Sequence, residues 1–177
     1  MAISDILGNA PLWDFIKDQN LREIITRKEF RVTEEYLNRE LVTRVGSDKV
    51  KELSLKIYDG HAEVTGKLKQ WPMPMSVPFL VRFELLGFEF NRNSRFVRLK
   101  VDLARPAGGD FFIGKLAEKI AFLTYEKGIA TCDLAKVPLL SGLFGYHLKG
   151  TPVIDFVTIK ELTLNKGEIV GKLGVSL

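Results

Sequence analysis

The chain has few of the residues from which catalytic and metal sites are usually built. Its 177 residues include one cysteine, Cys132, and two histidines, His61 and His147. A single cysteine excludes an internal disulfide and a CxxC metal pair. The two histidines form no HExxH or HxxxH zinc motif, and no GxSxG nucleophile motif occurs. The composition therefore favours a protein that is not an enzyme and that uses no metal or other cofactor.

Long hydrophobic runs are also missing. No segment approaches the roughly 18–20 apolar residues of a membrane-spanning helix. The first twenty residues lack the basic start and the apolar stretch of a signal peptide. With 46% apolar and 27% charged residues and a net charge of +4, we expect a soluble, cytoplasmic protein. Peripheral membrane contact and an anionic partner are left open by the mild basic excess.

One possible nucleophilic pair occurs in the sequence. Cys132 and His147 would make a thiol–imidazole pair if the fold brought them together. A structural role for Cys132 is favoured, because a lone cysteine beside Ile129, Ala130 and Leu134 is more often a small buried apolar residue.

The N-terminal part of the sequence reads as helical. Residues 9–28 carry an apolar side in one or two helical pieces. A clearer helix follows Thr33, a good N-cap, with Glu34 and Glu35 in its first turn, and Gly46 ends it. We therefore predict an N-terminal helical extension over residues 1–31 and one α+β domain over 32–177.

From residue 50 the apolar pattern changes to the period of two that is typical of strands. Asp59-Gly60 predicts a hairpin turn, and a second hairpin turns at Lys166-Gly167. Between them lies a long hairpin, whose first strand covers 76–90 and whose return strand reaches 103. The alternation slips at Leu85–Gly87, which predicts a β-bulge.

The long hairpin shapes the predicted fold class. A strand over 76–90 extends roughly 50 Å at about 3.3 Å per residue, more than the roughly 40 Å across a compact domain of this length. Either the strand bends or the molecule is elongated, and the bulge and the glycine midway along the strand favour bending. Residues 110–127 carry a broad apolar surface and read as a helix that ends at Gly128. We predict an α+β fold, with a strongly curved antiparallel sheet wrapped around this one long helix.

The two shorter hairpins echo each other in sequence. Residues 51–55 read KELSL and residues 160–164 read KELTL, and each is followed by a turn glycine and then by GKL, at 66–68 and 171–173. Chance and structural equivalence are both left open. In both copies the glycine of GKL falls on the apolar face, where it lets another group approach the sheet closely or lets the sheet bend.

The order of these segments along the chain resembles that of a known family. The order VTEEYLNREL, VKELSLKIYDGHAEVTGKL, a long hairpin, an apolar helix and a closing VTIKELTLNKGEIVGKLGV is similar to the bacterial LmeA-like phospholipid-binding proteins of the tubular lipid-binding (TULIP) superfamily. The likeness covers roughly residues 32–176. Its most specific parts are Leu37-Asn38 with Leu41, the Asp59-Gly60 turn and the Lys166-Gly167 hairpin. The resemblance implies a sheet and helix that enclose a slot for acyl chains.

We therefore expect non-catalytic binding or carriage of a lipid or other long apolar ligand. The predicted cavity lining is made of apolar residues from the long hairpin and the expected helix: Val81, Phe83, Phe88, Phe90, Leu99, Val101, Phe112, Leu116, Ile120 and Leu123. The same residues would equally form a filled core. A predicted rim would orient a head group through Trp71, Arg82, Arg95 and Arg98.

Two other interpretations compete with this one. The basic residues of the rim would also fit a plain solvated outer face. Nucleic acid is not expected, since the phenylalanines lie on the opposite face from the arginines. The alternative function is a structural or adaptor protein, whose apolar segment 9–28 docks on a partner or makes a homo-oligomer.

Overall fold

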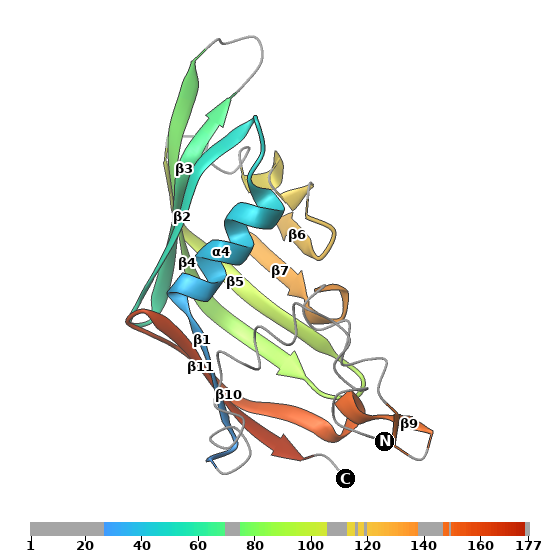
Figure 1. Ribbon diagram of the computed structural model, residues 1–177. Coiled ribbons are helices and arrows are strands. Elements are labelled where there is room, and N and C mark those ends of the chain that lie inside the picture. The colour runs from blue at the N-terminus through green and yellow to red at the C-terminus, as the bar shows by residue number, and fades with distance from the viewer. Residues whose placement is uncertain are drawn as a thin grey trace.

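The computed structural model describes residues 27–69, 75–105, 113–115, 117, 118, 120–137, 147, 148 and 150–175. Most of these residues lie in antiparallel strands (Figure 1). A six-stranded sheet has the order β2-β3-β4-β5-β7-β6. Its strands are β2 (Val50–Tyr58), β3 (His61–Lys69), β4 (Ser76–Phe90), β5 (Arg95–Arg105), β6 (Leu123–Glu126) and β7 (Ile129–Asp133).

Two smaller sheets complete the described strands. A three-stranded sheet has the order β1-β11-β10, from β1 (Glu29–Thr33), β10 (Val157–Asn165) and β11 (Glu168–Val175). A two-stranded sheet pairs β8 (His147–Leu148) with β9 (Thr151–Pro152). The helices described are α4 (Glu34–Val45) and the short 3-10 helices η1 (Leu134–Lys136) and η2 (Val153–Phe156).

The local predictions for helix α4 and the hairpins are confirmed. The Thr33 hydroxyl accepts a hydrogen bond from the Tyr36 amide, and Gly46 follows the last helical residue. Gly60 and Gly167 both adopt positive φ in their turns. Strand β4 covers the expected 76–90, and its register with β5 shifts between Leu85 and Gly87. Bending is the outcome that the sequence favours for so long a strand, and Figure 1 shows in addition a molecule elongated along β4.

The predicted α+β fold around one long helix is wrong. The antiparallel sheet is present, but no long helix occurs among the described residues. Within the expected helix 110–127, residues 113–115 form a short helical turn and residues 123–126 form strand β6. The described part of the chain is therefore mainly an antiparallel β structure, and the sheet does not wrap around a helix at 110–127.

The error has a physical reason at the Lys127-Gly128 turn. Both residues have positive φ, as a tight two-residue hairpin turn of this kind requires.

 

With Lys127 at 51° and Gly128 at 81°, the chain reverses and β6 pairs with β7. Gly128, which the sequence predicts as a helix stop, is therefore the second residue of a hairpin turn. Thr124, Tyr125 and Ile129 on either side are β-branched or aromatic residues, which favour strands.

The main core lies between α4 and one face of the six-stranded sheet. Its buried cluster consists of Val50, Leu53, Leu68, Phe79, Val81 and Ile113, and Leu41 of α4 packs against it. We call this side of the six-stranded sheet the inner face and the opposite side the outer face. Figure 1 shows α4 lying against the inner face. Because side chains alternate along each strand, the residues next to the core positions point outward.

The two echoing hairpins occupy equivalent places in the two larger sheets. In each, the second strand of the hairpin pairs with a further strand, β3 with β4 and β11 with β1. The glycine of GKL lies opposite a phenylalanine in both cases, Gly66 opposite Phe79 and Gly171 opposite Phe30. In both cases that phenylalanine ring occupies the space that a Cβ on the glycine would need. The close approach predicted at these glycines is thus made by an aromatic ring of the chain itself.

The glutamate of KEL and the lysine of GKL, which both hairpins share, also form equivalent contacts. The glutamate of KEL bonds to the lysine of GKL across the hairpin, at 2.8 Å for Glu52–Lys67 and 2.6 Å for Glu161–Lys172. Both first strands carry a register shift at KEL, between Lys51 and Ser54 in β2 and between Ile159 and Glu161 in β10. We therefore regard β2-β3-β4 and β10-β11-β1 as two structurally equivalent units.

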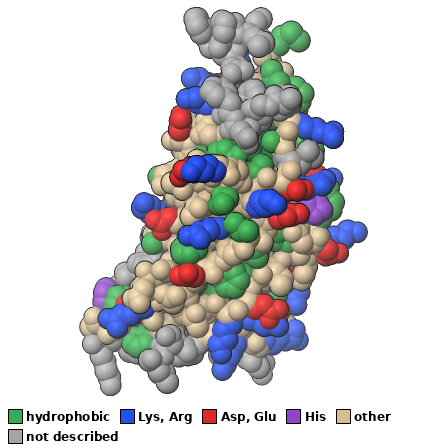
Figure 2. All heavy atoms as spheres, turned by 180° about the vertical axis from the view of Figure 1, so that it is seen from behind, with side chains coloured by type: hydrophobic (Ala, Val, Ile, Leu, Met, Phe, Trp, Pro, Cys, Tyr) green, Lys and Arg blue, Asp and Glu red, His purple; other side chains and the backbone are tan. Residues whose placement is uncertain are grey.

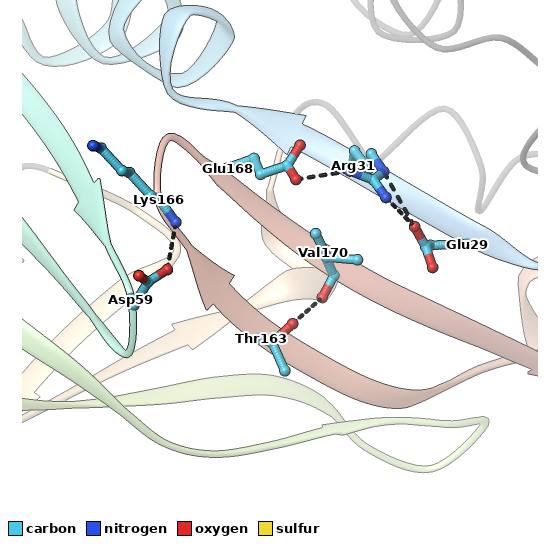
Figure 3. A network of polar contacts seen from close by, with 7 residues as sticks. All are labelled: Glu29, Arg31, Asp59, Thr163, Lys166, Glu168 and Val170. Atoms are coloured by element: carbon cyan, nitrogen blue, oxygen red, sulfur yellow. Dashed lines mark hydrogen bonds and ion pairs between the residues drawn. The ribbon is translucent and has the colours of Figure 1, made fainter.

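The tips of the two hairpins bind each other. The Gly60 amide donates to the Leu164 carbonyl at 3.0 Å, and the Gly167 amide donates to the Ile57 carbonyl at 2.9 Å. These two bonds are reciprocal, since each runs from a turn glycine to the residue three positions before the other turn glycine. The Asp59 carboxylate also accepts from the Lys166 backbone amide at 2.9 Å (Figure 3).

Helix α4 covers the free edge of β2 beside this junction. The Asn38 side chain accepts from the Leu55 amide at 2.6 Å and donates to the Leu55 carbonyl at 2.8 Å, as a neighbouring strand would. The Glu34 carboxylate accepts from the Ile57 amide at 2.8 Å, and its backbone amide donates to the Gly167 carbonyl. The edge of the sheet is thus closed by side chains. Asn38, Asp59-Gly60 and Lys166-Gly167, which carried the family resemblance, meet at this one place.

Strand β1 leads directly into α4, which begins at Glu34, and it also forms ion pairs within the three-stranded sheet. Arg31 of β1 bonds to Glu168 of β11 at 2.8 Å and to Glu29 at 2.9 Å (Figure 3). The predicted division after residue 31 therefore falls inside a strand that pairs with β11. Residues 1–26, which make up the rest of the predicted extension, lie outside the described residues.

Candidate ligand-binding face

The inner face of the six-stranded sheet changes character along its length. Near α4 its side chains are buried, as Phe79 and Val81 are at 5% and 3% exposure. Further along the β4–β5 hairpin the same face is only half-buried. The half-buried residues there are Phe83, Leu85, Phe88, Val97, Leu99 and Val101. This second half, which we call the open apolar strip, leaves apolar surface accessible.

Cross-strand register brings these residues together in rows. Phe83 lies opposite Val101, Leu85 opposite Leu99, and Phe88 opposite Val97. The rows continue into β7 and β6, where the buried Ala130 and then Tyr125 follow Leu99, and Cys132 and Leu123 follow Val97. The strip therefore crosses four strands, and a long apolar molecule laid on it would touch several rows at once.

The predicted cavity residues fall into three groups. Phe83, Phe88, Leu99, Val101 and Leu123 lie on the open apolar strip. Val81 and Phe90 are buried, so they belong to the packed interior. The last group comes from the expected helix: Ile120 is half-buried before β6, while Phe112 and the side chain of Leu116 lie outside the described residues.

Sequence reasoning missed the part of the strip that β6 and β7 supply. Tyr125 falls within the helix expected over 110–127, so it was not expected in the row of Leu99. The alternation of Leu123 and Tyr125 around the Lys127-Gly128 turn is the signal that would have placed them.

The predicted rim arginines do not come together. Arg82 lies on the outer face, where its guanidinium bonds to the Glu63 carboxylate at 2.8 Å and lies 3.9 Å from Asp102. The hydrogen bond to Glu63 raises the pKa of Arg82. Arg98 stacks over the Phe96 ring at 4.6 Å. These contacts fit a charge-balanced outer surface.

Arg95 has a different role. Its guanidinium bonds to the Asp155 carboxylate of η2 at 2.5 Å, and both side chains are largely buried, at 12% and 16% exposure. Since η2 leads directly into β10, this ion pair ties the end of the β4–β5 hairpin to the three-stranded sheet. Trp71, the remaining rim residue, lies outside the described residues.

The two residues of the nucleophilic pair weighed from the sequence lie in different sheets, Cys132 in β7 and His147 in β8. Cys132 faces the apolar strip from β7, and burial raises the pKa of its thiol from 9.0 to about 11. A thiol with so high a pKa is almost entirely protonated near neutral pH and is a weak nucleophile. His61 stacks on Tyr58 at 4.8 Å, and His147 is exposed in β8. Within the described ranges no cluster of His, Cys, Asp or Glu could hold a metal ion.

The adaptor interpretation depends on segment 9–28, of which residues 9–26 lie outside the described residues. Among the helices that the structure describes, none is long and apolar enough to cross a bilayer.

Comparison with known proteins leaves the family open. No model of a known protein family, no curated protein and no solved structure gives a significant match to the chain. The resemblance to the LmeA-like proteins therefore stays a prediction.

Proposed function

We propose that the protein binds a lipid or another long apolar molecule without catalysis, on the open apolar strip. The observation that carries this proposal is the half-buried state of six apolar side chains on the strip, from Phe83 to Val101. Phe83 and Val101 also touch the main core cluster, but all six side chains keep more accessible surface than Phe79 and Val81 do.

The binding energy would come from removing apolar surface from water. Each buried CH2 group contributes about 0.8 kcal/mol, which corresponds to roughly a fourfold gain in affinity. The strip offers rows from four strands, so longer chains would cover more rows. The slot against a long helix that the sequence predicted takes no part in this proposal.

The proposal is tested with the full chain and a series of saturated fatty acids of increasing length. We expect the affinity, measured by isothermal titration, to rise roughly fourfold per added CH2 until the strip is covered. Native mass spectrometry of the freshly purified protein should show a bound apolar molecule. Affinity that does not depend on chain length would contradict the proposal.

A pair of tryptophan variants locates the site. Val97→Trp adds a large side chain to the middle of the strip and should lower the affinity for the fatty acids. Leu86→Trp changes the exposed residue of the β4 bulge, 52% exposed, and should leave the affinity unchanged. Equal affinities of the two variants would place binding elsewhere.

A further inference from the structure

The outer face of the six-stranded sheet has an uneven distribution of charge. In its middle, acids and bases alternate across the strands, as with Glu63 opposite Arg82 and Glu84 opposite Lys100. At the end where β2 begins and β3 ends, basic residues dominate. We call this the cationic end and define it by Lys49, Lys51, Lys67, Lys69 and Arg105.

Strand register places these five side chains on one side. Lys51 lies directly opposite Lys67, and the neighbouring pair Val50 and Leu68 points into the core. Lys69 therefore shares the face of Lys67, and its amide bonds to the Lys49 carbonyl at 2.7 Å. Arg105 pairs with Leu80, whose neighbours Phe79 and Val81 are buried inward, so Arg105 also faces outward.

Little negative charge balances this end. Glu52 bonds to Lys67 at 2.8 Å, and Asp48 is exposed in the preceding loop. Lys49, Lys51, Lys69 and Arg105 form no ion pair with any described residue. Like charges directly opposite each other destabilise a strand pair, so the Lys51–Lys67 pair has a cost in the isolated protein. An anionic partner would remove that cost.

The apolar side chains nearby indicate which anionic partner fits. Met75 is 74% exposed and directly precedes Ser76, the residue that pairs with Lys69. Pro78 is exposed opposite Lys67. Figure 2, which views the face away from α4, shows basic and hydrophobic side chains near its upper end and mixed charges below. Cations around an exposed apolar side chain suit the head-group region of a bilayer, where each lysine near an anionic surface adds affinity.

We propose that the cationic end docks the protein on a membrane surface rich in anionic lipid. This inference rests on the proposed lipid binding for its choice of partner, because a protein that takes up a lipid must reach a surface that supplies one. Single-stranded nucleic acid fits less well, since the described residues of this end expose no aromatic side chain on which bases could stack.

The test measures cosedimentation of the full chain with vesicles of phosphatidylcholine, either alone or with about one third phosphatidylserine. Binding is expected only with phosphatidylserine, and it should weaken at high salt. The triple variant Lys49→Gln, Lys51→Gln, Lys69→Gln should bind about a hundredfold more weakly, as the loss of three surface lysines implies. Met75→Ser should also weaken binding, with no change of charge.

A matched control removes the same charge elsewhere. Lys100→Gln, Lys127→Gln, Lys166→Gln changes three exposed lysines outside the cationic end and should bind as the wild type does. Equal losses in both triple variants would overturn the proposal, as would tighter binding to a single-stranded RNA than to the anionic vesicles. The fatty-acid titration separates the two proposals. A cationic-end variant that keeps fatty-acid affinity but loses vesicle binding supports both, whereas vesicle binding without fatty-acid affinity would leave docking standing and remove the proposed ligand.

Discussion

The two equivalent units β2-β3-β4 and β10-β11-β1 follow the same cross-strand rules but end in different surroundings. In the first unit β4 continues into β5, β7 and β6, and α4 covers the face. In the second unit the third strand is β1, which has five residues and lies at the edge of its sheet. The two matched phenylalanines accordingly differ in exposure, since Phe79 is buried and Phe30 is half-buried. The shared pairing pattern thus sets the strand register in both units. How much each pairing stabilises the fold depends on the elements that cover it.

The largest expected effect is the loss of the matched rings. Phe79→Ala should lower the free energy of unfolding by about 3–5 kcal/mol, because it leaves a cavity in a packed core. Phe30→Ala should cost about half as much, since its ring is only half-buried. Urea unfolding of the two full-length variants gives both values. Equal costs would show that the small sheet contributes as much stability as the large one.

The glycines opposite those rings should show a smaller effect. A Cβ on Gly66 would lie 2.8 Å from Cζ of Phe79, and one on Gly171 would clash with the ring of Phe30. Overpacking of this kind costs about 1–3 kcal/mol. We expect Gly66→Ala to cost more than Gly171→Ala, because the buried Phe79 ring cannot move aside.

A double-mutant cycle checks that the ring causes the loss. Adding Phe30→Leu to Gly171→Ala should recover part of the lost stability, with a coupling of roughly 0.5–3 kcal/mol between the two sites. Losses that simply add would mean that the glycine is needed for a backbone reason instead.

The smallest effect on stability is expected at the two exposed ion pairs that the hairpins share, Glu52–Lys67 and Glu161–Lys172. The hydrogen bond to Glu161 raises the pKa of Lys172. A raised pKa in the folded protein stabilises it below the pKa of the unfolded chain, and this gain is lost as the pH rises through the folded value. Glu161→Gln should therefore lower the pKa of Lys172 in an NMR titration, with almost no change in stability. An unchanged pKa would contradict the assignment, and Glu52→Gln provides the matched substitution in the other unit.

Local signals were enough to predict much of the fold. The Thr33 cap, the Asp59-Gly60 turn, the length of β4 and the bulge at Leu85–Gly87 each depend on residues a few positions apart. The residues of the β4–β5 hairpin that form the open apolar strip could be chosen for the same reason, because alternation assigns them to one face.

The features that were missed depend on distant partners or on ambiguous periodicity. Strand β1 was not predicted, since Glu29–Thr33 becomes a strand only by pairing with β11, over 130 residues later. Tyr125 and Leu123 fit an apolar helix as well as a strand, and only the pairing of β6 with β7 decides between them. The cationic end was overlooked because Lys49 and Lys51 meet Lys67 and Lys69 only once β2 and β3 are in register.

The pairing of β1 with β11 also sets an order of events during synthesis. Residues 29–33 leave the ribosome early, but their partners, 168–172, are made near the end of the described chain. The six-stranded sheet draws only on residues 50–133 and can assemble first. Until translation passes residue 172, β1 has no strand to join, and such non-local closure is intrinsically slow. The small sheet is therefore expected to form after the six-stranded sheet, and a chaperone that holds nascent chains would meet β1 while it is still unpaired.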